Sequence, residues 1–490
     1  MEKLDILKNL TFGARVAEEE KENLKHYFVK TDQWKKIFSG EIDIIYGPKG
    51  SGKSAIYSFL SSSENELFER NILMTPAENP RGTPAFKDLN IDPPASEEEF
   101  VKLWKIYILL ITGVQIKEFK LKDESSIQLI KKLEECKLIP RRSSLSAYLK
   151  NSFDYVKGLT RPESIQPGIE VGESGMPTNF NFKITFREPT DNEIDNGFIS
   201  IDELFEVVNS AMTKNNLTLW IALDRLDVAF SENSELEKNA LRALFKVYLD
   251  LIPNERIRLK IFLRDDIWQR ITDGGFREAS HITKHTTIKW NRESILNLII
   301  RRLLNNNDIV SFYKTDVQGT LSDIDRQTQL FYRIFPYKIG NNEKSKSIDW
   351  IISRTRDGKG TDSPREIIHL LNQATDIQIK SMEIGKSNLE NKELLDDISI
   401  KKSLNEVSKV RIETAIFAEY PLLKEFILKL MNEKSQLAMT DLQGAWSRNR
   451  KNAMKIALEL VQIGFFERHG PKDEPYFIVP YLYRPYLNMT

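Results

Sequence analysis

The residues with the most recognisable chemistry form the loop GPKGSGKS, from Gly47 to Ser54. This loop matches the pattern GxxxxGK[ST], in which glycines let successive backbone N–H groups turn inward around an anion. In this pattern the ammonium of Lys53 reaches the β- and γ-phosphates of a nucleotide, and the hydroxyl of Ser54 binds Mg²⁺. The loop therefore predicts a site for ATP and Mg²⁺. The residues predicted to contact the nucleotide are Gly47, Pro48, Lys49, Gly50, Ser51, Gly52, Lys53, Ser54 and Ala55.

Both neighbours of the loop have the pattern that such a site requires. The run DIIY, Asp43–Tyr46, predicts a short buried strand before the loop. The segment Ser54–Leu60 after it has apolar side chains at helical spacing. A helix that begins at the loop adds its partial positive charge to the phosphate site. A glycine turn without a ligand is the alternative, and the strand–loop–helix order favours the phosphate site.

A phosphate loop needs a carboxylate elsewhere to share its metal, at the end of a buried strand. The apolar run Leu217–Leu223 ends at Asp224, which we predict as the second Mg²⁺ ligand. Many ATPases carry a glutamate directly after this aspartate to polarise the attacking water, but here that residue is Arg225. The next acid is Asp227, so either Asp227 orients water or hydrolysis is slow and the nucleotide acts as a switch. Turn or cap roles are the alternatives for both aspartates.

A second strand pattern, Arg256–Trp268, places an arginine at its end. In an open parallel sheet the carboxyl ends of the strands face the crevice where ligands bind. Arg264 is therefore predicted near the γ-phosphate, as a sensor. A salt bridge to Asp265 or Asp266 is the alternative.

A second arginine opens a predicted helix within Asp357–Ala374. Ser363 has the residue type of a helix cap, and Pro364 suits the first helical position. Arg365 follows and could reach the phosphates when a lid closes, or it could be a solvated surface arginine. The predicted catalytic residues are thus Lys53, Asp224, Asp227, Arg264 and Arg365.

These motifs together resemble the AAA+ and STAND branch of P-loop ATPases, which includes origin-recognition and initiator-loading proteins. The resemblance is carried by the phosphate loop, by LDRLD, FLRDD and SPRE, and covers roughly residues 10–380. More narrowly, Phe12–Tyr57 looks like the start of a bacterial family often encoded in antiviral-defence neighbourhoods. The resemblance implies an α/β fold with a three-layer αβα P-loop NTPase core and a helical lid. It also implies side-by-side assembly, in which Arg270 or Arg277 would touch the neighbouring subunit's phosphate; either could equally be a surface residue.

The rest of the chain divides by its patterns. Helices are predicted at Ser96–Phe119 and Asp123–Cys136, and a hairpin at Gly168–Phe186, in an insertion that either carries partner specificity or only shields the sheet. The predicted domains are an N-terminal helical linker (1–40), the ATPase core (41–290) with its insertion at about 77–199, a helical lid (291–382), a linker or exposed helix (383–409) and a winged-helix domain (410–490).

The last domain is predicted from three helical segments followed by two strands around a Gly-Pro turn. Residues 401–490 carry 14 Lys and Arg against 10 Asp and Glu, which is mildly basic. Four basic residues lie where a recognition helix would be, so the domain either binds double-stranded DNA or docks on a protein. They are Arg448, Arg450, Lys451 and Lys455.

The composition of the whole chain argues against several other classes of protein and site. Its 490 residues carry 71 basic and 71 acidic side chains, which argues against a surface coated for nonspecific nucleic-acid binding. The single cysteine, Cys136, excludes a disulfide framework and a cysteine zinc site. His281 and His285 alone make an incomplete metal site. Neither a signal peptide nor a spanning segment is evident, so we expect a soluble cytoplasmic protein.

The sequence thus predicts an ATP-hydrolysing AAA+/STAND-like protein that couples nucleotide state to assembly on DNA or on a partner effector protein. The resemblance implies a homo-oligomer and a setting in bacterial antiviral defence. The alternative is a weakly hydrolytic sensor or scaffold that uses its winged helix for protein contacts. A small-molecule kinase fits less well, since no acceptor site is evident.

Overall fold

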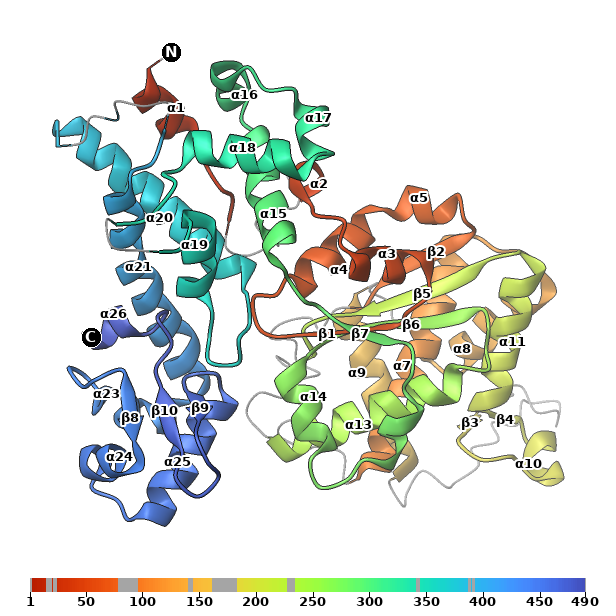
Figure 1. Cartoon of the computed structure of the whole chain (residues 1–490). Coiled ribbons are helices and arrows are strands. Elements are labelled where there is room, and N and C mark those ends of the chain that lie inside the picture. The colour runs from red at the N-terminus through yellow and green to blue at the C-terminus, as the bar shows by residue number, and fades with distance from the viewer. Residues whose placement is uncertain are drawn as a thin grey trace. The chain divides into compact units, whose positions relative to one another are not determined.

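The chain forms two compact units, each built from segments that are distant in sequence (Figure 1). This computed structural model describes residues 2–14, 20, 24–77, 96–139, 144–160, 183–226, 234–340, 344–386, 389 and 393–489. The sheet unit comprises Gln33–Tyr46 and Leu60–Thr287. The loop unit comprises Met1–Asp32, Gly47–Phe59 and Ile288–Thr490.

The sheet unit is built on five parallel strands in the order β2-β5-β6-β1-β7. β2 pairs with β5 from Ile72 opposite Thr218, and β5 pairs with β6 from Leu219 opposite Ile257. Parallel strands need crossover connections, and helices supply them here. β1, β5 and β6 form at the three runs that the sequence predicts as strands, although the third run is strand only as far as Arg264 because α14 (Asp265–Thr272) begins directly after it. The bounds of the five strands are β1 Ile44–Gly47, β2 Ile72–Pro76, β5 Thr218–Leu223, β6 Ile257–Arg264 and β7 His285–Thr287.

Helices cover both faces of this sheet, because both faces of its strands are apolar. Alternate residues such as Leu219, Ile221 and Leu259 join one large core with α7 and α13, while Trp220 faces the other side, near Gly40. Figure 1 shows α7 and α13 on one face and α3 and α5 on the other. The predicted α/β three-layer core is therefore confirmed. The helices are α3 Asp32–Ser39, α5 Glu64–Phe68, α7 Glu97–Glu118, α8 Glu124–Glu135, α9 Leu145–Thr160, α10 Asp191–Asp195, α11 Ile201–Lys214, α13 Ser234–Leu251, α14 Asp265–Thr272 and the 3₁₀ helix η3 Arg277–His281.

The described part of the predicted insertion is mostly helical and also contains the short strand β3 (Lys183–Thr185) and the start of β4 (Phe198–Ser200). Ser96 caps α7 by accepting a hydrogen bond from the N–H of Glu99, as the sequence predicts. The predicted hairpin at Gly168–Phe186 is different: residues 168–182 lie outside the described part of the chain. The remainder forms β3, which pairs in parallel with β4. The local alternation of apolar and polar residues predicts a strand, but it does not predict which strand pairs with it.

The loop unit combines a helical array with a small antiparallel sheet around one continuous core. The segment predicted as a linker or exposed helix contains α21, whose Ile400, Leu404 and Val407 side chains are buried. The helices are α1 Lys3–Asn9, α2 Leu24–Tyr27, α4 Lys53–Ser62 (which begins in this unit), α15 Arg292–Leu304, α16 Asn307–Tyr313, α17 Val317–Leu321, α18 Ile324–Ile334, α19 Ser347–Thr355, α20 Pro364–Glu383, α21 Asp397–Arg411, the π-helix η4 Ile412–Ile416, α22 Phe417–Glu419, the 3₁₀ helix η5 Pro421–Leu423, α23 Lys424–Leu428, α24 Met439–Trp446, α25 Arg450–Gln462 and α26 Arg484–Leu487.

The C-terminal part has winged-helix architecture, with strands in the order β8-β10-β9 beside α24 and α25. The predicted hairpin is β9 and β10, and the sequence missed β8. α24 begins after Ala438, whose N–H donates to Asp441 Oδ2 in the first turn. The strand bounds are β8 Gln436–Ala438, β9 Glu467–His469 and β10 Tyr476–Ile478. Within the described residues, no helix combines the length and the apolar composition needed to cross a bilayer.

One ion pair lies inside the sheet unit, next to β1. Lys260 of β6 is fully buried, and its Nζ donates to Asp43 Oδ1 at 2.8 Å and to the Ile42 carbonyl at 2.7 Å. The ammonium also lies 4.1 Å from the centre of the Trp220 ring. Burial lowers the pKa of Lys260 to about 8, although Asp43 opposes this shift. The strand before the phosphate loop is thus anchored by a charge that water does not reach.

We predict that Asp43→Asn destabilises the protein by about 3–5 kcal/mol, because it leaves the Lys260 ammonium buried without its counter-ion. The double variant Asp43→Asn/Lys260→Met should recover most of this loss. Urea unfolding followed by fluorescence measures both changes.

The pH dependence provides the control for this prediction. Between pH values of about 8 and 10.5 the unfolded chain holds a proton on Lys260 that the folded chain has lost. The stability of the wild type should therefore rise across this window relative to Lys260→Met. A double variant as unstable as Asp43→Asn alone would contradict the ion-pair account.

Candidate nucleotide site

The loop Gly47–Ser54 has the backbone that an anion site requires. Gly50 and Gly52 have φ angles of +84° and +100°, a region that L side chains rarely adopt. Lys53 begins α4, and its Nζ donates to the carbonyl oxygens of Gly47 at 2.8 Å and Pro48 at 2.9 Å. The loop therefore curls around the ammonium that the sequence predicts to meet the phosphates.

Side chains that lie more than 230 residues later in the chain contact this loop. Trp290 Nε1 donates to the Ser51 carbonyl at 2.8 Å. A Cβ at Gly50 would lie 2.7 Å from Ser363 Oγ and 3.2 Å from Arg365 Cβ, so only glycine fits there. The loop is thus packed directly against the start of α20.

This packing changes the role of one predicted residue. Ser363 occupies the cap position of α20, but its side chain makes no capping hydrogen bond. Its hydroxyl instead lies 3.4 Å from the Gly50 carbonyl, as a donor. Pro364 is at the start of the helix, as predicted, and Arg365 follows beside the loop. The structure therefore brings Arg365 to the phosphate loop, while its contact with phosphate stays a prediction.

A second lysine of the loop forms an ion pair that the sequence did not indicate. Lys49 pairs with Glu419 of α22, 370 residues later in the chain. Both side chains are only partly exposed, at 34% and 24%. Glu419 follows α21 and the π-helix η4, so the phosphate loop is tied electrostatically to the segment that leads into the winged helix.

The end of α21 carries a buried charge cluster. Arg411 Nη1 lies 3.3 Å from Glu366 Oε1 of α20, and Arg411 Nη2 lies 4.0 Å from Asp357 Oδ2. Burial lowers the pKa of Arg411, but Tyr483, Glu366 and Asp357 outweigh it and hold the pKa above its ordinary value. Burial raises the pKa of Asp357, which accepts hydrogen bonds from the backbone of the same turn. This cluster joins α21 to α20, the helix whose start packs against the phosphate loop.

The turn between α19 and α20, which contains Asp357, also contacts the winged-helix domain directly. The Gly358 N–H donates to the Gly464 carbonyl at 2.7 Å. A Cβ at Gly358 would come within 2.5 Å of the Phe466 carbonyl oxygen. The turn between α19 and α20 is therefore seated on the backbone that precedes β9.

The predicted metal ligand of the sheet unit is buried at the end of its strand. Asp224 directly follows β5 and is 3% exposed. Arg225 has a φ of +54°, which turns the chain sharply after that carboxylate. Asp227 lies outside the described residues. Among the residues that are described, no group of three or more His, Cys, Asp or Glu side chains could hold a metal, so Mg²⁺ at Ser54 and Asp224 would depend on phosphate oxygens.

The arginines predicted in the sheet unit have carboxylate partners in the structure. Arg264 contacts Asp266 through Nε at 3.0 Å and Nη2 at 2.8 Å, which is the alternative that the sequence left open. Arg270 pairs with Glu237 at 2.9 Å, and Arg277 is exposed at the start of η3. The sensor and neighbour-contact roles of these arginines stay predictions.

The basic residues of the winged helix lie on its surface. Arg448, Arg450, Lys451 and Lys455 are all exposed, before and on α25. Arg450 also donates to the Asp473 carbonyl in the turn between β9 and β10. Lys451 and Lys455 are four residues apart and share one helix face.

Two contacts of the candidate site escaped the sequence. Trp290 lies between β7 and α15, and Glu419 lies in a helical stretch without a motif. Neither has a local signal, because each acts only where the fold brings it to the loop. Gly50 gives the only partial signal among these residues. A glycine in such a loop indicates that another part of the chain packs closely against it, but it does not identify that part.

Comparison with known proteins gives similarity in structure only. No family model matches the chain, and no curated protein matches it. The chain is similar to the Aeropyrum pernix ORC2 protein in its ADPNP-ADP complexes, with a TM-score of 0.42 and 13% identity over 98% of this chain and 95% of that one. It is also similar to the Aeropyrum pernix ORC1 protein in complex with DNA, with a TM-score of 0.37 and 9% identity over 94% and 91%. Cdc6p from Pyrobaculum aerophilum has a TM-score of 0.31 and 10% identity over 95% and 94%.

We predict that Lys53→Ala abolishes nucleotide binding without unfolding the protein, since it removes one ammonium from a loop whose shape depends on glycines and tertiary contacts. The measurement is the thermal shift with ATP and Mg²⁺. The matched control is Lys429→Ala, which removes an exposed ammonium directly after α23. Full ATP stabilisation of Lys53→Ala would contradict the assignment of the loop.

Proposed function

We propose that this chain is an ATP-dependent AAA+/STAND-like switch that couples the nucleotide at its phosphate loop to assembly on DNA or on a partner protein. The observation that carries the proposal is the environment of the loop Gly47–Ser54. Its ammonium, its left-handed glycines, the start of α20 and the Lys49–Glu419 pair all meet in one compact unit. A nucleotide bound there would touch the groups that lead to the winged helix.

The coupling follows from charge competition. A bound triphosphate brings several negative charges to the loop, and these compete with Glu419 for Lys49. Arg365, beside Gly50, would gain a phosphate partner at the same time. ATP would thus loosen α22 and hold the start of α20, and hydrolysis would reverse both effects. A switch of this kind needs differential contacts in its two states, which these two side chains provide.

Hydrolysis would use the acid at the end of β5. Asp224 would share Mg²⁺ with Ser54 and the phosphates, and Arg264 would respond to the γ-phosphate. A second candidate function is a sensor or scaffold with little turnover. The feature that favours it is Arg225, which occupies the position after Asp224 with a left-handed backbone where many ATPases carry an acid. In that case Asp227 would not orient water.

The winged helix would supply the partner surface. Its exposed basic residues on α25 suit the phosphates of double-stranded DNA, and the same face could dock on an effector protein. We further propose a homo-oligomer in which Arg277, or Arg270 released from Glu237, reaches a neighbour's nucleotide. The bacterial and antiviral-defence setting, and the cytoplasmic location, follow from the sequence resemblance and pattern as part of this proposal.

We predict that Asp224→Ala lowers Mg²⁺-dependent phosphate release at least about a hundredfold, because the metal loses the carboxylate that we assign to it. The variant should keep some ATP affinity through Lys53. Phosphate release is measured with and without duplex DNA. Unchanged turnover would reject Asp224 as a ligand.

The wild type in the same assay separates the two functions. DNA-stimulated turnover supports the active ATPase, whereas tight ATP binding with negligible turnover supports the sensor.

We predict that exchanging Arg448, Arg450 and Lys451 for glutamine weakens binding to duplex DNA and makes its salt dependence shallower, by up to about three in the logarithmic slope. Fluorescence anisotropy at several salt concentrations measures both. The matched control exchanges Lys424, Lys429 and Lys434, which are exposed in the same domain but not on α25. Equal losses in both triple variants, or no duplex affinity of the wild type at low salt, would remove DNA from the proposal.

A further inference from the structure

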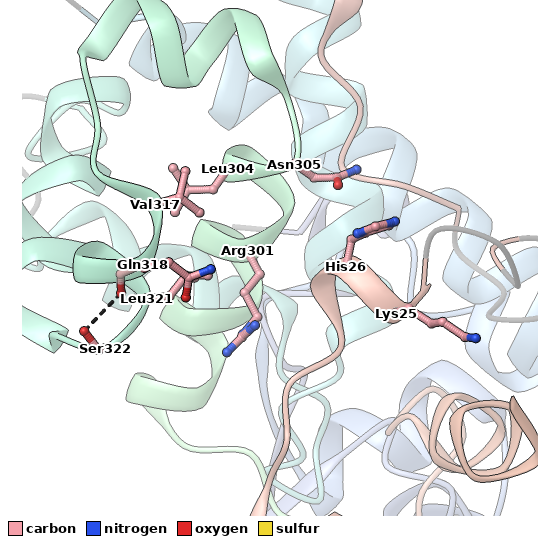
Figure 2. Close-up of a pocket in the computed structure, with 9 residues that line it drawn as sticks. All are labelled: Lys25, His26, Arg301, Leu304, Asn305, Val317, Gln318, Leu321 and Ser322. Atoms are coloured by element: carbon pink, nitrogen blue, oxygen red, sulfur yellow. Dashed lines mark hydrogen bonds between the residues drawn. The ribbon is translucent and has the colours of Figure 1, made fainter. Parts of the chain in front are cut away.

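The loop unit contains a pocket of 540 Å³ that is separate in sequence from the phosphate loop (Figure 2). Its walls come from α2, from the end of α15 and from α17 and the residue after it. Three lining residues are cationic or can become so: Lys25, His26 and Arg301. None of the residues that line the pocket carries a carboxylate. The volume lies in the range of small-molecule sites.

Arg301 is the central polar group of this pocket, and a chain of hydrogen bonds fixes it. Its Nε donates to Asn297 Oδ1 at 2.8 Å, and Asn297 Nδ2 donates to Gln327 Oε1 at 3.2 Å. Gln327 is 3% exposed, and its Nε2 donates to the Leu321 carbonyl at 3.1 Å. Asn297 thus fixes the Nε side of the guanidinium, and the chain of bonds continues to α18 and α17.

The neighbouring arginine shows what a purely structural role looks like in the same helix. Arg302 is 7% exposed and contacts both carboxylate oxygens of Glu20, at 3.0 and 3.1 Å. Its guanidinium also lies 4.3 Å from the centre of the Tyr27 ring, which anchors α2 on α15. In the described part of the chain no carboxylate pairs with Arg301, and burial lowers its pKa. A partly desolvated cation without a counter-ion is costly unless an anion joins it.

The residues of the other walls indicate what kind of anion the pocket could bind. Leu304, Val317 and Leu321 supply an apolar side, while Gln318 and Ser322 offer polar groups. Figure 2 shows Arg301 and His26 on facing elements, with Lys25 at the edge and its ammonium directed away from Arg301. An inorganic ion would use only the polar part of this space. A ligand with both a phosphate and an apolar body would use all of it.

We propose that this pocket binds a small organic phosphate, with the phosphate bidentate on Arg301 and the apolar body against Leu304, Val317 and Leu321. The site is independent of the phosphate loop and of the function proposed for it. Because α15 and α17 belong to the same core as α20, an occupied pocket would stabilise the helical array that carries Arg365.

The test uses phenyl phosphate, which joins a phosphate monoester to an apolar ring and lacks the triphosphate that the loop Gly47–Ser54 suits. Calorimetry and saturation-transfer NMR on the full chain measure its binding, with inorganic phosphate and phenol as comparison ligands. We expect saturable binding of phenyl phosphate that is equal in the wild type and in Lys53→Ala. Inorganic phosphate should bind more weakly, and phenol should not bind.

Arg301→Gln should weaken phenyl phosphate at least about tenfold, since it removes the charge and keeps the size of the side chain. Arg468→Gln is the matched control, at an exposed position on β9 away from the pocket walls, and should leave the affinity unchanged. Gln318→Ala, at an exposed position, keeps the proposal testable if Arg301→Gln does not fold; it should weaken binding severalfold.

Several outcomes would overturn the proposal. These are no saturable binding in the wild type, unchanged affinity in Arg301→Gln and Gln318→Ala, or loss of binding in Lys53→Ala, which would return the ligand to the phosphate loop. Equal affinity for inorganic phosphate would remove the apolar body from the site. Displacement of phenyl phosphate by duplex DNA would reassign the pocket to a nucleic-acid backbone.

Discussion

The close packing of α20 on Gly50 is the constraint on which the loop unit depends. A left-handed glycine with no room for a Cβ lets Ser363 and Arg365 approach the backbone that would surround a phosphate. Any larger residue would push the helix away and separate the arginine from the loop. In the same contact the Ser363 hydroxyl donates toward the Gly50 carbonyl, and it makes no capping hydrogen bond to its own helix. The start of α20 thus lacks a side-chain cap, while the same serine makes a contact with the phosphate loop.

Electrostatic contacts extend this packing toward the C-terminus. Lys49 reaches Glu419, and Arg411 connects the helices α21 and α20 through Glu366. Around Arg411 the charges are buried and mutually compensated, so removing one partner would leave another without its counter-ion. Around Lys49 the pair is partly exposed and therefore cheaper to break. The ion pairs between α20 and α21 are thus costly to break. The Lys49–Glu419 pair at the phosphate loop is less costly to break, and a ligand could compete with it there.

Much of this arrangement could be predicted from the sequence. Apolar runs ending in Asp224 and Arg264 predict buried parallel strands, and the helix predicted from Ser96 begins there in the structure. The phosphate loop is recognisable because its glycines and Lys53 are consecutive. Trp290 and Glu419 could not be predicted, since their partners are hundreds of residues away and no local pattern marks them. The first helical segment predicted in the last domain gives only a short helix, because Pro421 opens a 3₁₀ turn and α23 already ends at Leu428.

The wide turn at Ile412–Ile416 has a consequence for the register of everything after it. A π-helical turn contains one residue more than an α-helical turn over a similar rise. Each residue of an α-helix rotates the next side chain by roughly 100°. Deleting a single residue within this turn would thus leave both flanking helices intact yet rotate Glu419 to a different side of the helix. The chain length of one turn, rather than any charged residue, sets which side chain faces Lys49.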